Sequence, residues 1–415
     1  MIVRPTTSPY SKISIYIDIK TLLISLFLLC VGLACIYSAT ISVSPDKFNR
    51  QLISAGIGLV AMLVVSRIRI SYIKRFSFIF YSIMMVLLLG LFPWGALGDY
   101  GTQGWYKFAG LSFQPAEFAK ISLIFAIANY LSIKGNSIGN IVDIGKINII
   151  FLCPFILILL QPDVGTALTL FVLYMGLLYW AGADLYYGLF MLALIVMFIA
   201  SLTASTTVIL IVGIVSAIVL LFFRKKIYIY IISVMIIVGA GFISDNIFDA
   251  LPTHQQNRIK VFLNPETDIQ GIGYNLTQSK LAVGSGGITG KGFREGSITQ
   301  YKYVPMQYTD FIYSVPAEEF GLIGASVILL GLLYLCYRGI NIAYQSKDIF
   351  CSLTAFGASI IMLFHIVYNI GMVLGIFPVM GIPLPFFSHG GTFLISNLIY
   401  VGLLMNINRS NSRLE

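Results

Sequence analysis

Charged residues are scarce in this sequence. Only 10% of its 415 residues are Asp, Glu, Lys or Arg, whereas a soluble globular domain carries about 25%. Hydrophobic residues make up 58% of the chain, and its mean hydropathy is +0.90. So few charges cannot cover the water-facing surface of a chain this long, which excludes a soluble enzyme. We therefore predict an integral membrane protein.

Cysteine and histidine are also rare, with five and three residues in the whole chain. The cysteines, all in apolar runs, are Cys30, Cys35, Cys153, Cys336 and Cys351. They show neither a disulfide framework nor C-x-x-C spacing, so we expect small buried hydrophobic side chains. His254, His365 and His389 have no ligand spacing, which argues against a His/Cys metal site. The net charge of +9 does not indicate a nucleic-acid partner, because in a membrane protein the positions of Lys and Arg matter more than their sum.

Long apolar runs recur along the chain. A membrane-spanning helix needs about 20 mostly apolar residues, because backbone polar groups cannot stay unpaired in hydrocarbon. Twelve such segments occur, at 18–40, 51–66, 76–93, 114–133, 147–161, 164–181, 185–203, 205–223, 227–245, 311–336, 349–374 and 390–407. The sequence thus predicts an all-α, polytopic membrane protein with about twelve spans in one domain, residues 1–415.

Lys and Arg are concentrated in alternate connecting segments. Cytoplasmic loops carry the excess of these residues, and with the N-terminus inside, 16 of the 26 fall on the cytoplasmic side. They are Arg4, Lys12, Lys20, Arg67, Arg69, Lys74, Arg75, Lys134, Lys146, Arg224, Lys225, Lys226, Arg338, Lys347, Arg409 and Arg413. Because the number of spans is even, we predict that both termini are cytoplasmic.

Two outer segments differ from the rest in composition. Residues 94–113 form a short loop rich in aromatic residues and Gly, and residues 246–310 hold 11 charged residues. Loops of this length without their own structure are usually functional or disordered, and the Tyr, Phe, Val and Leu content here argues against disorder. We expect an ordered extracytoplasmic lid over 246–310, with a short amphipathic helix near residues 276–283.

Charged residues within or beside the spans each need an explanation, since a charge at a helix centre costs about 2.5–3.5 kcal/mol. Glu117 and Lys120 share one face at the start of the fourth span. Two interpretations are equally open: an internal ion pair that fixes packing, and a pair beside a polar cavity that meets an anionic substrate. Asp163 follows Pro162, which interrupts an apolar run, and capping of the next helix is favoured over a role in a site.

Asp310 lies where the long outer loop returns to the membrane. Pro316 fits a first helical turn, so we expect the tenth helix to start between Thr309 and Pro316. Glu318 and Glu319 then lie early in that helix. From this segment alone an N-cap is the preferred interpretation of Asp310, and a carboxylate with a shifted pKa at a membrane entrance is the alternative.

Two irregular segments complete the outer face. Residues 284–292 (GSGGITGKG) fail the P-loop pattern, because Ser285 replaces its first Gly and Gly292 replaces its Ser or Thr. Their N–H groups and Lys291 can still face a phosphate as a nest does. Residues 381–391 (GIPLPFFSHGG) are predicted to be rigid and nonhelical, which a membrane edge tolerates beside protein or a wet cavity.

Five motifs stand out along the chain: WYKFAGLSFQPAEFAKI, QPDVGTAL, RIKVFLNPETDIQGIGYNLTQSKLAVGSGGITGKG, TDFIYSVPAEEFGLIG and NIGMVLGIFPVMGIPLPFFSHGG. In order and spacing they resemble the motifs of the SEDS family (shape, elongation, division and sporulation). The resemblance covers most of the chain between residues 100 and 405. The Gly290-Lys291-Gly292 triplet and the run from Phe262 to Glu266 look more like the rod-shape (RodA) branch than the division (FtsW) branch.

The resemblance implies a peptidoglycan glycosyltransferase that polymerises lipid II into β-1,4 glycan strands at the outer face of the bacterial cytoplasmic membrane, for cell elongation and shape. It implies a class B penicillin-binding transpeptidase as partner. Residue by residue, it places Asp310, Glu117, Lys120, Asp163 and Arg258 in the site. An α-linked donor and a β-linked product imply inversion, with Asp310 as general base. Charge on the departing pyrophosphate would be offset by Lys120, Arg258, Lys291 and Arg294, or by a divalent ion such as Mg²⁺ or Mn²⁺.

The family usually has ten spans, so residues 182–245 are expected to hold an extra helix pair. The main alternative function is a transporter, in particular a lipid II flippase, because buried charges and broken helices also suit substrate pathways. The one-sided polar mass and the lack of a visible repeat favour the polymerase. A third possibility is a non-catalytic scaffold for a transpeptidase, in which Asp310 is dispensable.

The predicted topology can be tested by cysteine labelling. A cysteine introduced at Gln270 should react with an impermeant maleimide added outside intact cells, because that segment belongs to the outer lid. A cysteine at Lys225 should react only after the membrane is opened. The unaltered chain gives the background from the native cysteines, and the reverse labelling pattern would place the N-terminus outside.

Overall fold

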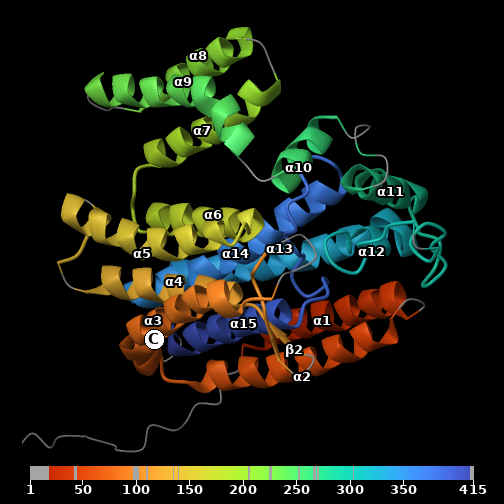
Figure 1. The fold of residues 1–415 in the computed structure, drawn as a ribbon. Helices are drawn as coiled ribbons and strands as arrows, with labels where there is room; N and C mark the ends of the chain where they lie inside the picture. The colour runs from red at the N-terminus through yellow and green to blue at the C-terminus, as the bar shows by residue number, and fades with distance from the viewer. Residues whose placement is uncertain are drawn as a thin grey trace, which may run out of the picture.

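The computed structural model describes residues 18–411 except 42–43, 97–101, 109–110, 134, 139, 204–205, 224–226, 251–252, 265–267, 269–270 and 302. Long helices dominate it (Figure 1). They are α1 (Ile19–Thr40), α2 (Pro45–Arg67), α3 (Ile70–Trp94), α4 (Pro115–Ser132), α5 (Ile141–Leu160), α6 (Val164–Trp180), α7 (Leu185–Thr203), α8 (Thr206–Leu221), α9 (Ile227–Ala250), α13 (Gly321–Gln345), α14 (Ile349–Val373) and α15 (Gly391–Asn411). The shorter elements are β1 (Tyr106–Phe108), β2 (Leu111–Phe113), α10 (Thr253–Leu263), α11 (Ile272–Ser285) and α12 (Ser314–Glu319).

Eleven of the twelve predicted spans each overlap one of these long helices, and the span predicted at 311–336 overlaps α12 and α13. Among the described residues, seven helices are long and apolar enough to cross a bilayer, namely α1, α2, α3, α5, α13, α14 and α15. Helix α6 is apolar but shorter, and α4 carries the charged Glu117 and Lys120. The chain is a polytopic, all-α membrane protein, and spanning by the remaining five long helices stays a prediction.

Helices α4, α14 and α15 form the centre of the main body (Figure 1). Helix α14 packs against α4, α6, α13 and α15, while α15 packs along α2. The outer helices show the opposite pattern, since large apolar side chains such as Val60 in α2 and Val86 in α3 are exposed. Lipid can cover such side chains. Polar side chains on the three central helices are therefore shielded from hydrocarbon by other helices.

Helices α7, α8 and α9 have a hydrophobic core of their own. It consists of Tyr186, Met197, Ile209, Leu220 and Ile237, and it is separate from the core of the main body. In Figure 1 these helices lie to one side of the other long helices. Residues 182–245, where the sequence predicts an extra helix pair, include α7, α8 and most of α9, and an addition of two helices to the family core stays a prediction.

The start predicted for the tenth helix, between Thr309 and Pro316, is confirmed, because α12 begins at Ser314 and contains Glu318 and Glu319. The prediction of one continuous span at 311–336 is wrong, because the helix is broken. The structure has the six-residue helix α12, a break at Phe320, and then α13 from Gly321. Gly321 has a φ of +63°, in the left-handed region that favours Gly. The N-cap position of α12 is Tyr313, whose side chain makes no capping hydrogen bond. Asp310 is therefore not the cap of α12.

The Gly-rich loop that follows α11 packs on this break. The amides of Lys291 and Gly292 donate to the carbonyl oxygens of Glu318 and Glu319, at 3.1 and 3.0 Å. A Cβ added to Gly290 would lie 2.2 Å from the carbonyl oxygen of Glu319, so only Gly permits this approach. The interpretation of the loop as a phosphate nest is wrong for these amides, because the fold already uses them.

Both acidic side chains of α12 are buried and fasten the outer loop. Glu318 is 0% exposed. Its carboxylate accepts hydrogen bonds from the Nζ of Lys291 at 2.7 Å and from the main-chain N–H groups of Ile298 at 2.9 Å and Thr299 at 2.8 Å. Glu319 accepts from Gln300 Nε2 at 3.1 Å and from the hydroxyl of Ser38 in α1. The predicted lid is thus ordered beside α12 and tied to the first helix.

Other expectations had mixed outcomes. Within residues 94–113, β1 and β2 form an antiparallel hairpin that a loop prediction missed. The amphipathic helix expected near residues 276–283 is confirmed as α11, which is longer at both ends, whereas α10 was not anticipated. All five cysteines are free, and Cys35, Cys336 and Cys351 are buried as expected. Cys30 and Cys153 are exposed on the helix surface, so the expectation was wrong for them.

Three glycines of the outer loop give a graded test of its packing. An added Cβ meets no atom within 4 Å at Gly284 or at Gly287, but Gly287 has a φ of +57°. Gly290 combines a φ of +83° with the clash against Glu319. A left-handed conformation costs a non-Gly residue about 1–2 kcal/mol. In detergent melting curves we expect G284A to leave the melting temperature unchanged, G287A to lower it, and G290A to lower it most. Equal losses for G287A and G290A would contradict the packing of this loop on α12.

Candidate functional site

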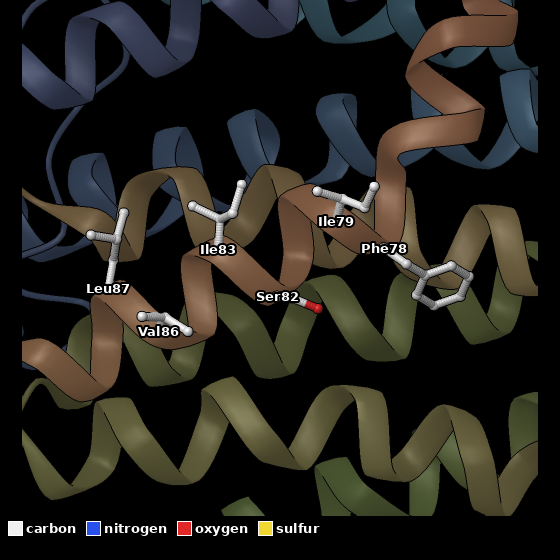
Figure 2. Close-up of a pocket in the computed structure, with 6 residues that line it drawn as sticks. All are labelled: Phe78, Ile79, Ser82, Ile83, Val86 and Leu87. Carbon is white, nitrogen blue, oxygen red and sulfur yellow. The ribbon is translucent and has the colours of Figure 1, made fainter.

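One hollow of the surface lies along α3 and has a volume of about 460 Å³. Figure 2 shows the side chains that line it on that helix: Phe78, Ile79, Ser82, Ile83, Val86 and Leu87. Five of these side chains are hydrocarbon, and only Ser82 carries a polar atom. This groove offers no group for catalysis and fits a surface that faces lipid.

A second cavity, of about 210 Å³, has a different character. The first turns of α4, α6 and α15 line it, together with the last turns of α14, helix α10 and the outer loops. Its polar lining comprises Thr102, Gln114, Glu117, Asp163, Thr166, Thr169, Arg258, Thr309, Asp310, His365 and His389. The cavity therefore joins four predicted site residues that are far apart in the sequence: Glu117, Asp163, Arg258 and Asp310.

Asp310 lies in the turns before α12 and is half-buried at the cavity wall. Burial raises the pKa of its carboxyl to about 6, and the positive charge of Arg258 opposes that rise. Near neutral pH the group is therefore mostly ionised and more basic than an ordinary carboxylate. Such a group suits proton abstraction from a hydroxyl within hydrogen-bond reach.

The nonhelical chain between α14 and α15 holds the turn that carries Asp310. Ser388 Oγ donates to the carbonyl oxygen of Thr309 at 2.7 Å, and the amide of His389 donates to the carbonyl oxygen of Tyr308 at 2.8 Å. Gly381 has a φ of +71°, and a Cβ there would lie 3.7 Å from Oδ2 of Asp310. The predicted irregular segment at residues 381–391 is thus confirmed, and it borders the cavity.

Glu117 and Lys120 form a buried ion pair, with 2.8 Å between Oε1 and Nζ and exposed fractions of 4% and 1%. The same Nζ lies 3.4 Å from Nε2 of His365, whose Nδ1 lies 3.0 Å from the carbonyl oxygen of Pro383. Because that carbonyl only accepts, we assign the proton to Nδ1, so Nε2 accepts from Lys120. Glu117 and His365 line the cavity, whereas Lys120 lies behind them. Both interpretations of the pair hold in part, since it is an internal ion pair and one member faces a polar cavity.

Asp163 caps α6, as predicted. Its Oδ1 accepts from the amide of Thr166 at 3.0 Å, and its Oδ2 accepts from the hydroxyl of the same residue at 2.8 Å. The carboxylate also lines the cavity. Its capping bonds fix its orientation there, so its two predicted roles are compatible.

The other two predicted cations lie away from this cavity. Lys291 pairs with Glu318 at 2.7 Å and donates to the hydroxyl of Ser285 at 2.8 Å. The guanidinium of Arg294 lies 5.7 Å from the ring centre of Tyr37 in α1. Neither residue lines the cavity. Within the described part of the chain, Arg258 supplies the guanidinium or ammonium group on its wall.

Some lining residues were not predicted. Among them, His365 was visible in the sequence as the histidine of an apolar span, and His389 as part of the nonhelical segment. Trp105 and Phe393 carried no signal beyond being aromatic. Among the described residues, no three His, Cys, Asp or Glu side chains lie close enough to hold a metal ion. The described part of the cavity therefore offers no ready cluster of three such ligands, and no step below uses a metal ion.

Comparison with known proteins gives consistent relatives. The family model of the cell cycle proteins FtsW, RodA and SpoVE matches residues 20–208 and 186–413. Peptidoglycan glycosyltransferase MrdB of Escherichia coli (strain K12) is 30% identical over 406 residues, which cover 97% of this chain and 96% of that protein. Peptidoglycan glycosyltransferase RodA of Treponema pallidum (strain Nichols) is 32% identical over 435 residues, covering 94% of this chain and 97% of that protein.

Solved structures share the fold. A chain of a peptidoglycan synthase complex superposes with a TM-score of 0.73 at 22% identity, covering 96% of this chain and 99% of that one. The rod shape determining protein RodA of Thermus thermophilus superposes with a TM-score of 0.60 at 22% identity, covering 96% and 98%. At these identities the likeness concerns the fold alone. The sequence matches extend over nearly the whole length, and the chain therefore belongs to the FtsW, RodA and SpoVE family of cell cycle proteins.

Proposed function

We propose that this chain is a peptidoglycan glycosyltransferase that polymerises lipid II into β-1,4 glycan strands. Its family and the activity named for its relatives MrdB and RodA support this assignment. The observation that carries it is Asp310, a carboxyl with a pKa of about 6 on the wall of a polar cavity beside Arg258. The cavity opens among helix ends, where a lipid-linked sugar can reach water while its tail stays in the bilayer.

The chemistry is a single displacement. Asp310 accepts the proton of the acceptor's C4 hydroxyl as that oxygen attacks C1 of the donor sugar. The bond from C1 to the pyrophosphate oxygen breaks, and the lipid pyrophosphate leaves with the bonding electrons. Attack from the face opposite the leaving group converts the α-linked donor into a β-linked product.

Negative charge gathers on the leaving pyrophosphate, and a fixed cation in a poorly hydrated site stabilises it. Arg258 lies on the cavity wall and is the candidate for this role. Lys120 is already engaged by Glu117 and His365, so we assign it to holding those two groups. Lys291 and Arg294 act in this proposal by ordering the lid.

The assembly follows from the same proposal. The cavity faces the outer side of a bacterial cytoplasmic membrane, with both termini in the cytoplasm and a class B penicillin-binding transpeptidase as partner. A fold neighbour comes from a peptidoglycan synthase complex studied for the coordination of polymerization and crosslinking, which supports such a partner. A flippase is less well supported, because the cavity lies at one end of the helices instead of midway along them.

Replacing Asp310 by Asn tests the base. With purified protein and lipid II, alone and with the transpeptidase, we expect glycan chains from the wild type. We expect a loss of at least about a hundredfold for D310N, within the range for general bases. Glycan chains resolved on a gel give the measurement. Polymerisation by D310N at the wild-type rate would refute the assignment of the base.

The D310N variant should also differ from the wild type in thermal stability. The folded pKa of Asp310, about 6, exceeds the unfolded value of about 3.9, so ionisation of this carboxyl destabilises the folded chain as pH rises from about 4 to 6. D310N should therefore melt at a higher temperature than the wild type at pH 7.5, and the difference should vanish near pH 4. A lower melting temperature at pH 7.5 would indicate that the carboxylate stabilises the fold.

The pH dependence of the rate tests the role of Arg258. The rate should fall below pH 6 as Asp310 is protonated. In the wild type the positive charge of Arg258 lowers the pKa of Asp310. R258Q removes that charge, so the pKa of Asp310 should rise and the acid limb should move to higher pH. R258K keeps the charge and should leave the limb near its wild-type position. His389 lines the same cavity, and burial lowers the pKa of its imidazole from 6.5. H389N is therefore measured in parallel, and loss of the acid limb in that variant would assign the limb to His389.

A further inference from the structure

Asn369 lies at the end of α14, beside the cavity, and is 0% exposed. Its Nδ2 donates one hydrogen bond to the main-chain oxygen of Asp310 at 2.8 Å and another to the main-chain oxygen of Ile382, also at 2.8 Å. One amide group therefore joins the turn that carries the carboxylate to the neighbouring nonhelical segment, which forms part of the cavity wall. We propose that Asn369 is a positioning residue, which holds Asp310 at the distance from that wall that proton transfer requires.

The support behind this amide is rigid. Asn369 belongs to a 25-residue helix at the centre of the molecule, and His365, one turn earlier on the same face, bonds Pro383 of the same segment at 3.0 Å. Helix α14 thus forms hydrogen bonds with two successive main-chain carbonyls of this segment, those of Ile382 and Pro383. It contacts the Asp310 turn with a hydrogen bond through Asn369.

The side-chain oxygen of Asn369 shows that only the N–H groups of this amide have partners. Oδ1 of Asn369 is buried and has no hydrogen-bond partner among the described residues. An unpaired buried carbonyl destabilises a fold, so this amide is not the side chain that gives the most stable packing. Its two N–H groups are what the position uses, and they reach main-chain oxygens of two segments that line the cavity.

The rate of proton transfer depends on where the carboxylate of Asp310 lies. The proton acceptor must lie within hydrogen-bond reach of the hydroxyl that it deprotonates, and a displacement of about 1 Å can reduce a rate by about a hundredfold. Without Asn369 the main chain at Asp310 keeps its bonds from Ser388 and His389 to the two preceding residues. The turn would stay folded while the carboxylate loses its fixed distance from the Gly381–Pro383 wall.

Asn406 provides a matched control. It is 1% exposed, and its Nδ2 also donates to two main-chain oxygens, those of Val65 and Ile68, both at 2.7 Å. Those acceptors lie at the C-terminal end of α2, away from the cavity lining. Leu is close in shape to Asn and has no donors, so N369L and N406L each remove two equivalent hydrogen bonds to main-chain oxygens from a buried position. N406L also removes the hydrogen bond that Oδ1 of Asn406 accepts from Arg409 at 3.2 Å, so it loses at least as many contacts as N369L.

The experiment compares the two variants with the wild type, and because it rests on the proposed function it has two independent readouts. In lipid II polymerisation we expect N369L to lower kcat by about 10- to 100-fold with KM within about threefold. N406L should keep the wild-type kcat even where its melting temperature falls. N369Q, which retains both amide hydrogens, should recover part of the lost kcat.

The second readout does not need activity. A water-soluble carbodiimide modifies carboxyl groups, and mass spectrometry reports its rate at Asp310. We expect this rate to change at least about threefold in N369L and to stay at the wild-type value in N406L, since only the first alters the surroundings of the carboxyl. If N369L does not accumulate as folded protein, N369S is judged by the same criteria.

The outcomes separate the two ideas. A wild type that forms no glycan refutes the proposed function, and the labelling then decides the positioning role by itself. With an active wild type, an unchanged kcat in N369L overturns the inference. Equal losses of kcat in N369L and N406L also overturn it, because the effect would then be one of stability alone.

Discussion

The main chain between α14 and α15 satisfies only some of its own polar groups, and much of the site depends on this constraint. Residues 374–390 leave the helical pattern where the protein interior excludes water, so their N–H and C=O groups need other partners. Gln51 of α2, 1% exposed, supplies two of them, by donating to the carbonyl of Ser388 at 3.3 Å and accepting from the amide of Gly390 at 3.1 Å. His365 and Asn369 of α14 supply others. Polar residues within apolar helices are thereby explained as partners of one nonhelical segment.

Helix α1 supports both sides of the outer structure. At Gly32 a Cβ would lie 2.2 Å from the carbonyl oxygen of Phe386, so α1 packs directly on the nonhelical segment. Two turns later the hydroxyl of Ser38 bonds Glu319, which belongs to the anchor of the lid. The lid and the wall of the cavity therefore rest on the same helix. A shift of α1 would be transmitted to both through contacts that leave little space.

The spans could be predicted because each has a local cause. Twelve apolar runs gave twelve helices, and the Pro162-Asp163 pair identified the start of α6 with its cap. The local rule failed at α12, where Pro316 correctly signalled a helix but nothing local revealed the break before Gly321. That break exists because the Gly-rich loop packs against it, which is a tertiary contact. Asp310 showed the same limit, since its segment alone favoured a cap, whereas the resemblance and the cavity favour a site.

The three carboxylates of the cavity differ in what already occupies their oxygens, and this difference argues for one of them as the base. Glu117 accepts from Lys120 and from the hydroxyl of Ser396, so two donors already occupy its oxygens and hold it in place. Asp163 is occupied by its two bonds to Thr166. Asp310 is held through its main chain, and burial makes its side chain more basic. A carboxyl that is fixed through its backbone and readily protonated can take up a proton and release it without breaking the contacts that position it. The same cannot be said of the other two, for which protonation would weaken an ion pair or a helix cap.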